Sequence, residues 1–140
     1  MNKNLCLRNL ATAICLLCIC TCCGQETTID VDGGKAPTIH VHGTDAVDWI
    51  WVYGPQGPEG EGPRIIWKIN HTGDPLLIPD LPSITYGKVP EGFEQEIPAN
   101  GEPPSLVDGQ IYGITVVTRG YSHGNIKIRV QNGQSLKVQN

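Results

Sequence analysis

The chain has 140 residues and a formal net charge of −4, and its lysines and arginines are scattered along it. Nucleic acids need clustered cations against their phosphates, so the sequence predicts no nucleic-acid partner. A hydrophobic share of 39% with 17% charged residues excludes an intrinsically disordered chain. The 17 glycines and 11 prolines have no fixed period, which excludes a collagen-like fibre and indicates many turns.

The N-terminal leader contains every cysteine of the chain. Lys3 and Arg8 stand ahead of an apolar run at residues 10–21. This run is shorter than the about 20 residues of a membrane-spanning helix and is typical of the helix of a secretory signal. All six cysteines lie at or before Cys23. Because a disulfide framework or a zinc site would place cysteines in the folded part, the sequence predicts neither there.

The end of this apolar run resembles the lipobox of bacterial lipoproteins. In Ile19-Cys20-Thr21-Cys22 an aliphatic residue and two further residues precede a cysteine. The resemblance implies that residues 1–21 are a signal peptide and that Cys22 carries the lipid. Thr21 stands where the family has Gly, Ala or Ser, so Cys23 is kept as the alternative. An ordinary secretory signal without a lipid is the other interpretation.

A lipidated cysteine has consequences for where the protein is found. Several acyl chains on one residue hold a protein to a membrane essentially permanently. The resemblance therefore implies a protein of the bacterial cell envelope, with the outer membrane favoured over the inner one. The folded domain is expected in the periplasm or at the cell surface.

The residues after the leader divide into a tether and a β domain. Residues 22–37 are polar and glycine-containing and are expected to form a tether, with one alternating stretch at residues 28–31. Between residues 38 and 140, short apolar runs alternate with period two, and no segment sustains an apolar period of 3.6 residues. Strands are predicted at residues 28–31, 38–42, 48–53, 64–70, 76–78, 83–86, 111–118, 125–131 and 136–138.

These short strands, separated by turns, predict the fold class. The expected domain at residues 38–140 is all-β, an antiparallel β-sandwich of the immunoglobulin-like kind, with a small β-barrel as the alternative. A flexible loop rich in proline and glycine is expected at residues 54–63, and a long ordered loop or an irregular sheet edge at residues 87–110. The stretch that begins at residue 84 and continues into the second of these regions resembles uncharacterised bacterial lipoproteins in the spacing of Ile84, Tyr86, Gly87, Pro90, Gly92, Phe93 and Gln95. No activity comes with that resemblance.

Aromatic residues are the first candidates for a functional site. Trp49, Trp51 and Tyr53 recur at period two and share one face of the strand predicted at residues 48–53. Large aromatic side chains contribute heavily to protein cores, so one interpretation is that they are the core. The other is that they form a platform for a glycan or a peptide, with Trp67 beside them. Their exposure to solvent decides between the two.

Histidines are the second candidates. His40 and His42 would share one strand face, and a His-x-His pair occurs in some metal sites. Two exposed histidines on the polar side of a strand are the simpler interpretation. The sequence thus predicts no metal site and no cofactor. The chain contains no Gly-x-Ser-x-Gly motif, and no enzymatic activity is predicted.

Together these features predict a lipid-anchored envelope protein whose β-sandwich is a non-catalytic structural or interaction module. One alternative is a small glycan- or peptide-binding protein that uses the aromatic strand face. Another is a metal-binding protein that uses His40 and His42, with a metal-dependent activity. The expected partners are the membrane, through the lipid anchor, and a protein or glycan of the envelope.

Overall fold

The structure is a computed structural model that describes residues 26–57, 61–120 and 122–138. The predicted signal peptide and both candidate lipidation residues, Cys22 and Cys23, lie outside these ranges. Over the described ranges, no helix has the length and apolar character needed to cross a membrane.

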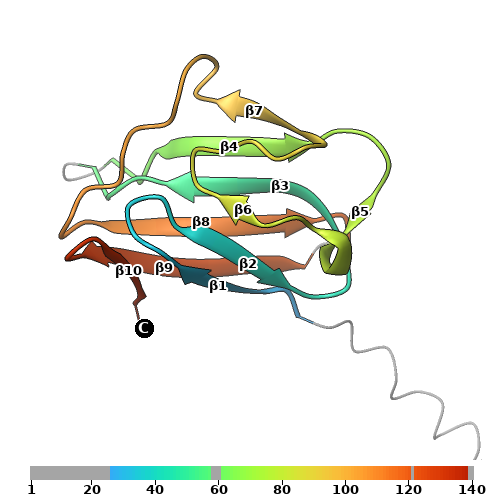
Figure 1. Ribbon diagram of the computed structural model, residues 1–140, viewed down its shortest axis with the longest axis horizontal. Coiled ribbons are helices and arrows are strands. Elements are labelled where there is room, and N and C mark those ends of the chain that lie inside the picture. The colour runs from blue at the N-terminus through green and yellow to red at the C-terminus, as the bar shows by residue number, and fades with distance from the viewer. Residues whose placement is uncertain (1–25, 58–60, 121, 139–140) are drawn as a thin grey trace, which may run out of the picture.

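Two antiparallel sheets pack against each other, which confirms the predicted all-β sandwich over a closed barrel (Figure 1). The first sheet has the order β1-β2-β6 and consists of β1 (Thr28–Asp32), β2 (Thr38–His42) and β6 (Ile84–Thr85). The second has the order β10-β9-β8-β3-β4-β7 and consists of β3 (Ala46–Tyr53), β4 (Ile65–His71), β7 (Phe93–Ile97), β8 (Ile111–Thr118), β9 (His123–Gln131) and β10 (Gln134–Lys137). The short strand β5 (Leu76–Leu77) pairs with β3, and the 3-10 helix η2 (Ile78–Asp80) follows it.

Period-two alternation builds the core between the sheets. In β9 the inward side chains Ile126, Ile128 and Val130 are buried, while the residues between them are exposed. β8 alternates in the same way. The largest side chains without solvent contact come from both sheets and include Trp67, Ile39, Ile50, Ile69 and Ile84.

The domain begins earlier than the expected boundary at residue 38. β1 lies within the predicted tether at residues 22–37, yet it pairs with β2 along its full length. Its inward side chain Ile29 is only 3% exposed, because it packs over Gly124 of β9. A Cβ atom at Gly124 would come within 2.9 Å of Ile29 Cγ1, so only glycine lets β1 lie this close.

Residues 87–110, for which the sequence predicted a long ordered loop or an irregular sheet edge, contain an edge strand. This strand, β7, pairs with β4 and forms one edge of the larger sheet. Phe93 begins this strand and is buried, and the exposed Glu94 and Glu96 alternate with inner residues. The flanking prolines obscured a short run with the period of a strand.

Candidate functional site

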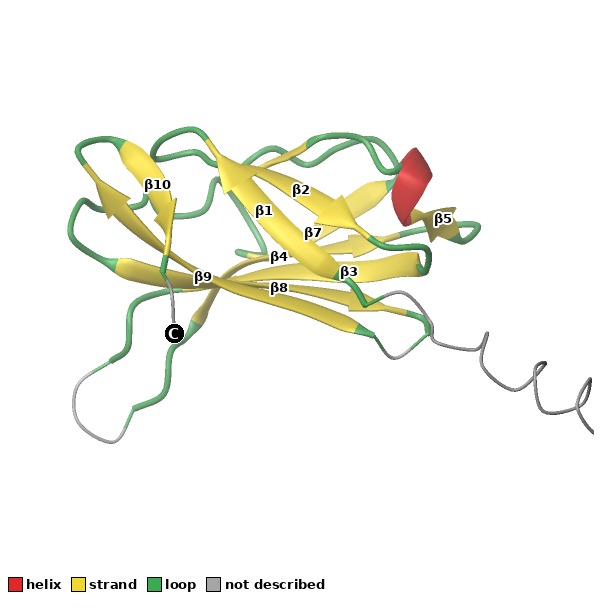
Figure 2. Cartoon of the chain, turned by 90° about the horizontal axis from the view of Figure 1, so that it is seen from below, coloured by secondary structure: helices red, strands yellow, loops and turns green. Residues whose placement is uncertain are grey.

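β3 separates its apolar side chains onto two faces of the larger sheet. Ile50 and Val52 point into the core and are at most 1% exposed. Trp49, Trp51 and Tyr53 point to the opposite, outer face and are partly exposed. Among the described residues, no second sheet covers this face (Figure 2). The three aromatic side chains therefore form a row on the outside of the sandwich, which we call the aromatic row.

Trp67 does not belong to this row. It is 0% exposed and lies in the core, where its ring meets that of Tyr86 edge-on with centroids 5.4 Å apart. Its indole nitrogen donates a hydrogen bond to Gln95 Oε1 at 3.0 Å. The cause is the register of β3 and β4, which pairs Trp67 with the inward residue Val52. The expected fourth member of an aromatic platform is thus a core residue.

The two tryptophans of the aromatic row interact with each other and with the charged side chain of Lys68. Their rings are stacked with centroids 6.1 Å apart and an interplanar angle of 5°. Lys68 Nζ lies 5.7 Å from the ring centroids of both Trp49 and Trp51, within the range of a cation–π interaction. Glu96 forms an ion pair with Lys68 and accepts a hydrogen bond from Asn70 at 2.8 Å. These two partners, Lys68 first, hold the pKa of Glu96 below its ordinary value.

The other end of the row opens onto a hollow of about 840 Å³, which we call the Tyr53 hollow. Its floor is formed by residues 111–115 of β8 and 125–127 of β9. Tyr53 and residues of the β3–β4 loop form one wall, and Lys137 and Val138 line it from the C-terminal segment. In Figure 2 the β3–β4 loop extends from the same outer face of the sheet.

The hollow combines an aromatic wall with polar groups. Thr115 Oγ1 donates a hydrogen bond to Asn125 Oδ1 at 2.7 Å across β8 and β9. The amide nitrogen of Asn125 thereby keeps its two N–H donors. Lys127 follows Asn125 on the same face of β9, and the side chains of both are exposed. The described lining contains no carboxylate, thiol or imidazole, and its polar groups are hydroxyl, amide and ammonium groups.

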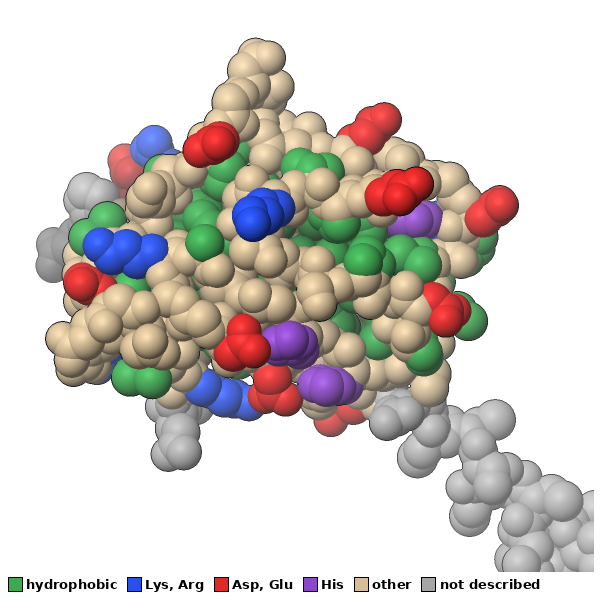
Figure 3. Space-filling view, in the orientation of Figure 1, with side chains coloured by type: hydrophobic (Ala, Val, Ile, Leu, Met, Phe, Trp, Pro, Cys, Tyr) green, Lys and Arg blue, Asp and Glu red, His purple; other side chains and the backbone are tan. Residues whose placement is uncertain are grey.

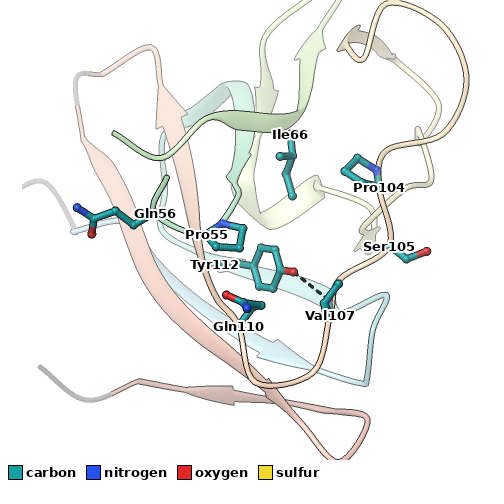
Figure 4. Close-up of a pocket in the computed structure, with 8 residues that line it drawn as sticks. All are labelled: Pro55, Gln56, Ile66, Pro104, Ser105, Val107, Gln110 and Tyr112. Atoms are coloured by element: carbon teal, nitrogen blue, oxygen red, sulfur yellow. Dashed lines mark hydrogen bonds between the residues drawn. The ribbon is translucent and has the colours of Figure 1, made fainter. Parts of the chain in front are cut away.

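A second, smaller cavity of about 480 Å³ adjoins the Tyr53 hollow and shares Gln56 and Tyr112 with it. Figure 4 shows that it lies between the β3–β4 loop and the segment before β8. The Tyr112 hydroxyl accepts a hydrogen bond from the backbone N–H of Val107 at 2.8 Å. Pro55, Ile66 and Pro104 give the cavity a mainly apolar lining. It has fewer hydrogen-bonding side chains than the Tyr53 hollow.

His40 and His42 lie on the outer face of the first sheet. His40 Nε2 is 3.0 Å from Asp32 Oδ2, and His42 Nε2 is 3.3 Å from Asp30 Oδ2. Histidine and acidic side chains gather on this face in Figure 3. Among the described residues, no group of three or more His, Cys, Asp or Glu side chains is arranged to hold a metal ion. Each histidine is instead paired with an aspartate of β1.

No protein-family model, no curated protein and no solved structure matches this chain. The chemistry of its surfaces therefore carries the functional argument. The sequence predicted that Trp49, Trp51 and Tyr53 share one strand face, as they do in β3, but it gave no sign of the hollow at the end of the row. Tyr53, Asn125 and Val138 meet there from distant parts of the chain, and no local motif connects them.

Proposed function

We propose that this protein is a lipid-anchored component of a bacterial cell envelope whose sandwich binds a glycan on the outer face of the larger sheet. The lipobox-like leader supports the anchor. The observation that carries glycan binding is the aromatic row, which is partly exposed on a face that no described strand covers and ends at the Tyr53 hollow. A monomeric protein gains little from aromatic side chains on its surface unless they contact a partner.

The combination of groups at Tyr53 favours a sugar. A pyranose presents an apolar C–H face, which an aromatic ring can cover, and a rim of hydroxyl groups. Tyr53 supplies the ring, and Thr115, Asn125 and Gln56 supply hydroxyl and amide groups around it. Sites for small ligands have this composition, mostly apolar with a few polar groups that fix orientation.

A peptide fits this position less well. Extended peptides usually bind by adding a strand to the free edge of a sheet. The Tyr53 hollow lies on the face of β8 and β9, both of which have a neighbouring strand on each side. At the nearby edge, β10 is covered by the turn after β1, since Ser135 N–H donates to Gly33 O at 2.8 Å. A backbone donor that a peptide could use at this edge is thus already paired.

Metabolic labelling tests the anchor. The full-length protein, expressed in a bacterium with a lipoprotein-processing pathway, is expected to incorporate radiolabelled palmitate. Cys22→Ser should abolish the label, and Cys23→Ser should retain it. The opposite result would assign the lipid to Cys23. A wild-type protein that incorporates no palmitate would contradict the lipid anchor, and label that persists in the double variant would contradict its assignment to either cysteine.

A glycan array tests the binding function. The full-length protein, purified in detergent, is expected to bind a subset of oligosaccharides, and Tyr53→Ala should weaken that binding about tenfold or more. Leu77→Ala is a suitable control, because Leu77 is an exposed apolar residue of β5 at a distance from the hollow. Equal binding by wild type and Tyr53→Ala would contradict a role for this end of the aromatic row.

A further inference from the structure

We infer that the Tyr53 hollow selects acidic glycans, in which a sugar carboxylate is bound by Lys127 and Asn125 while Tyr53 packs against the sugar ring. This inference rests on the proposed glycan-binding function and specifies its ligand class. It follows from the charge, the hydrogen-bonding groups and the size of the hollow.

The charge of the hollow is opposite to that of the chain. The chain carries a formal charge of −4, yet the described lining contains two lysines and no aspartate or glutamate. Lys137 Nζ lies 3.9 Å from Asp30, so its charge is directed toward the first sheet. Within the described residues, no carboxylate lies within ion-pairing distance of Lys127. Its ammonium group is thus available to an anion.

Lys127 is supported by its neighbour on the same strand. Side chains two residues apart share a face, which places Asn125, Lys127 and Arg129 in one column along the outer face of β9. The hydrogen bond from Thr115 to Asn125 Oδ1 fixes the amide so that its N–H groups face away from Thr115. An ammonium and an amide that both donate are suited to a carboxylate, which only accepts.

The absence of acidic groups from the described lining argues against a neutral sugar as the preferred ligand. Hydroxyl groups of a neutral sugar donate most strongly to carboxylates. The lining offers them only amide, hydroxyl and backbone oxygens. Burial raises the pKa of Tyr53, so its phenol stays uncharged near neutral pH and does not repel an anion. The volume of about 840 Å³ is large enough for a short oligosaccharide rather than a single carboxylate ion.

Paired ligands provide the test. The probes are uronate-containing oligosaccharides and the same oligosaccharides after chemical reduction of their carboxyl groups to neutral hydroxymethyl groups. Binding to the full-length protein in detergent is measured by calorimetry at low and at physiological salt. At least one acidic probe is expected to bind about tenfold more tightly than its reduced counterpart, and this preference should decrease as salt rises.

Paired variants assign the preference to this hollow. Lys127→Gln should reduce the ratio between the affinities for acidic and reduced probes to within about twofold. Lys35→Gln makes the same change of charge at an exposed residue between β1 and β2, and it should leave the ratio unchanged. Both lysines are exposed, so neither change is expected to affect folding.

The outcomes separate this inference from the function on which it rests. If reduced and acidic probes bind equally and Tyr53→Ala still weakens binding, the glycan site stands and its acidic selectivity is wrong. If the preference survives Lys127→Gln, an acidic glycan binds elsewhere and the assignment to this hollow is overturned. If no glycan of either kind binds, both proposals are wrong.

Discussion

Gln95 connects the core tryptophan to the segment that follows β7, and its replacement tests how this side of the sandwich is held together. Its Oε1 accepts the indole N–H of Trp67 at 3.0 Å. Its Nε2 donates to Pro98 O and to Gly101 O, each at 2.9 Å. One amide therefore satisfies a donor in the core and two carbonyl groups of a loop. We expect Gln95→Ala to be among the most destabilising single changes outside the apolar core.

The magnitude follows from the three contacts. Loss of Gln95 leaves the N–H of the fully buried Trp67 without an acceptor, which costs about 1–3 kcal/mol. Each of the two bonds to loop carbonyls contributes about 0.5–1.5 kcal/mol, with the lower values applying where solvent can replace the donor. The bond to Gly101 O is exposed. The expected decrease in the free energy of unfolding is about 2–4 kcal/mol.

Urea unfolding followed by far-ultraviolet circular dichroism measures this decrease. Trp67→Phe provides the second arm of a double-mutant cycle, because it removes the N–H donor and keeps an aromatic ring in the core. In the double variant, Gln95→Ala should cost about 1–2 kcal/mol less than in the wild type, since no donor is then left unpaired. A loss below about 0.5 kcal/mol for Gln95→Ala alone, or additive effects in the cycle, would refute this account of the hydrogen bond.

Two further predictions concern packing and pH. Gly124→Ala should lower the free energy of unfolding by about 1–3 kcal/mol, because the added Cβ forces Ile29 and β1 away from β9. Gly62→Ala is the control: no described atom lies within 4 Å of its added Cβ, so it should be nearly neutral in the same urea assay. Because the pKa of Glu96 is lowered, its ion pair with Lys68 is fully formed above the ordinary pKa of 4.5. The pair is lost only as the pH falls through the lowered pKa. Tryptophan fluorescence should therefore change below pH 4.5 in the wild type but not in Glu96→Gln, and a transition centred above pH 4.5 would contradict this prediction.

The sequence was most informative about strands in which apolar and polar residues alternate, because the alternation alone shows which side chains are buried. Residues 125–131 alternate strictly between apolar and polar, and the structure has β9 at His123–Gln131 with that alternation. The buried face of β3 was harder to predict, because Trp49 and Trp51 are as apolar in character as the valine and isoleucine residues next to them. Period two showed that the aromatic residues share a face, but it could not show which face is covered. That depends on the other sheet, which comes from distant parts of the chain.

Register was the information that the sequence lacked. Trp67 was grouped with Trp49 and Trp51 because all three lie in neighbouring strands. Whether it points inward or outward depends on its partner on β3, and the pairing with Val52 turns it inward. The Tyr53 hollow has the same origin, since it requires the pairing of β8 with β9 and the position of the C-terminal segment.

The direction of β1 gives the domain an orientation relative to its anchor. Thr27, just before β1, contacts Ser122 at the end of the sandwich where β8 ends, and Tyr53 lies at the opposite end of β3, where it pairs with Gly113 (Figure 1). If Cys22 carries the lipid, residues 23–27 span at most about 18 Å between the bilayer surface and the fold. So short a connection keeps the end of the sandwich at Thr27 close to the bilayer, and the Tyr53 hollow at the opposite end then faces away from it. The proposed glycan site would then face polymers in front of the membrane, beyond the reach of lipid headgroups.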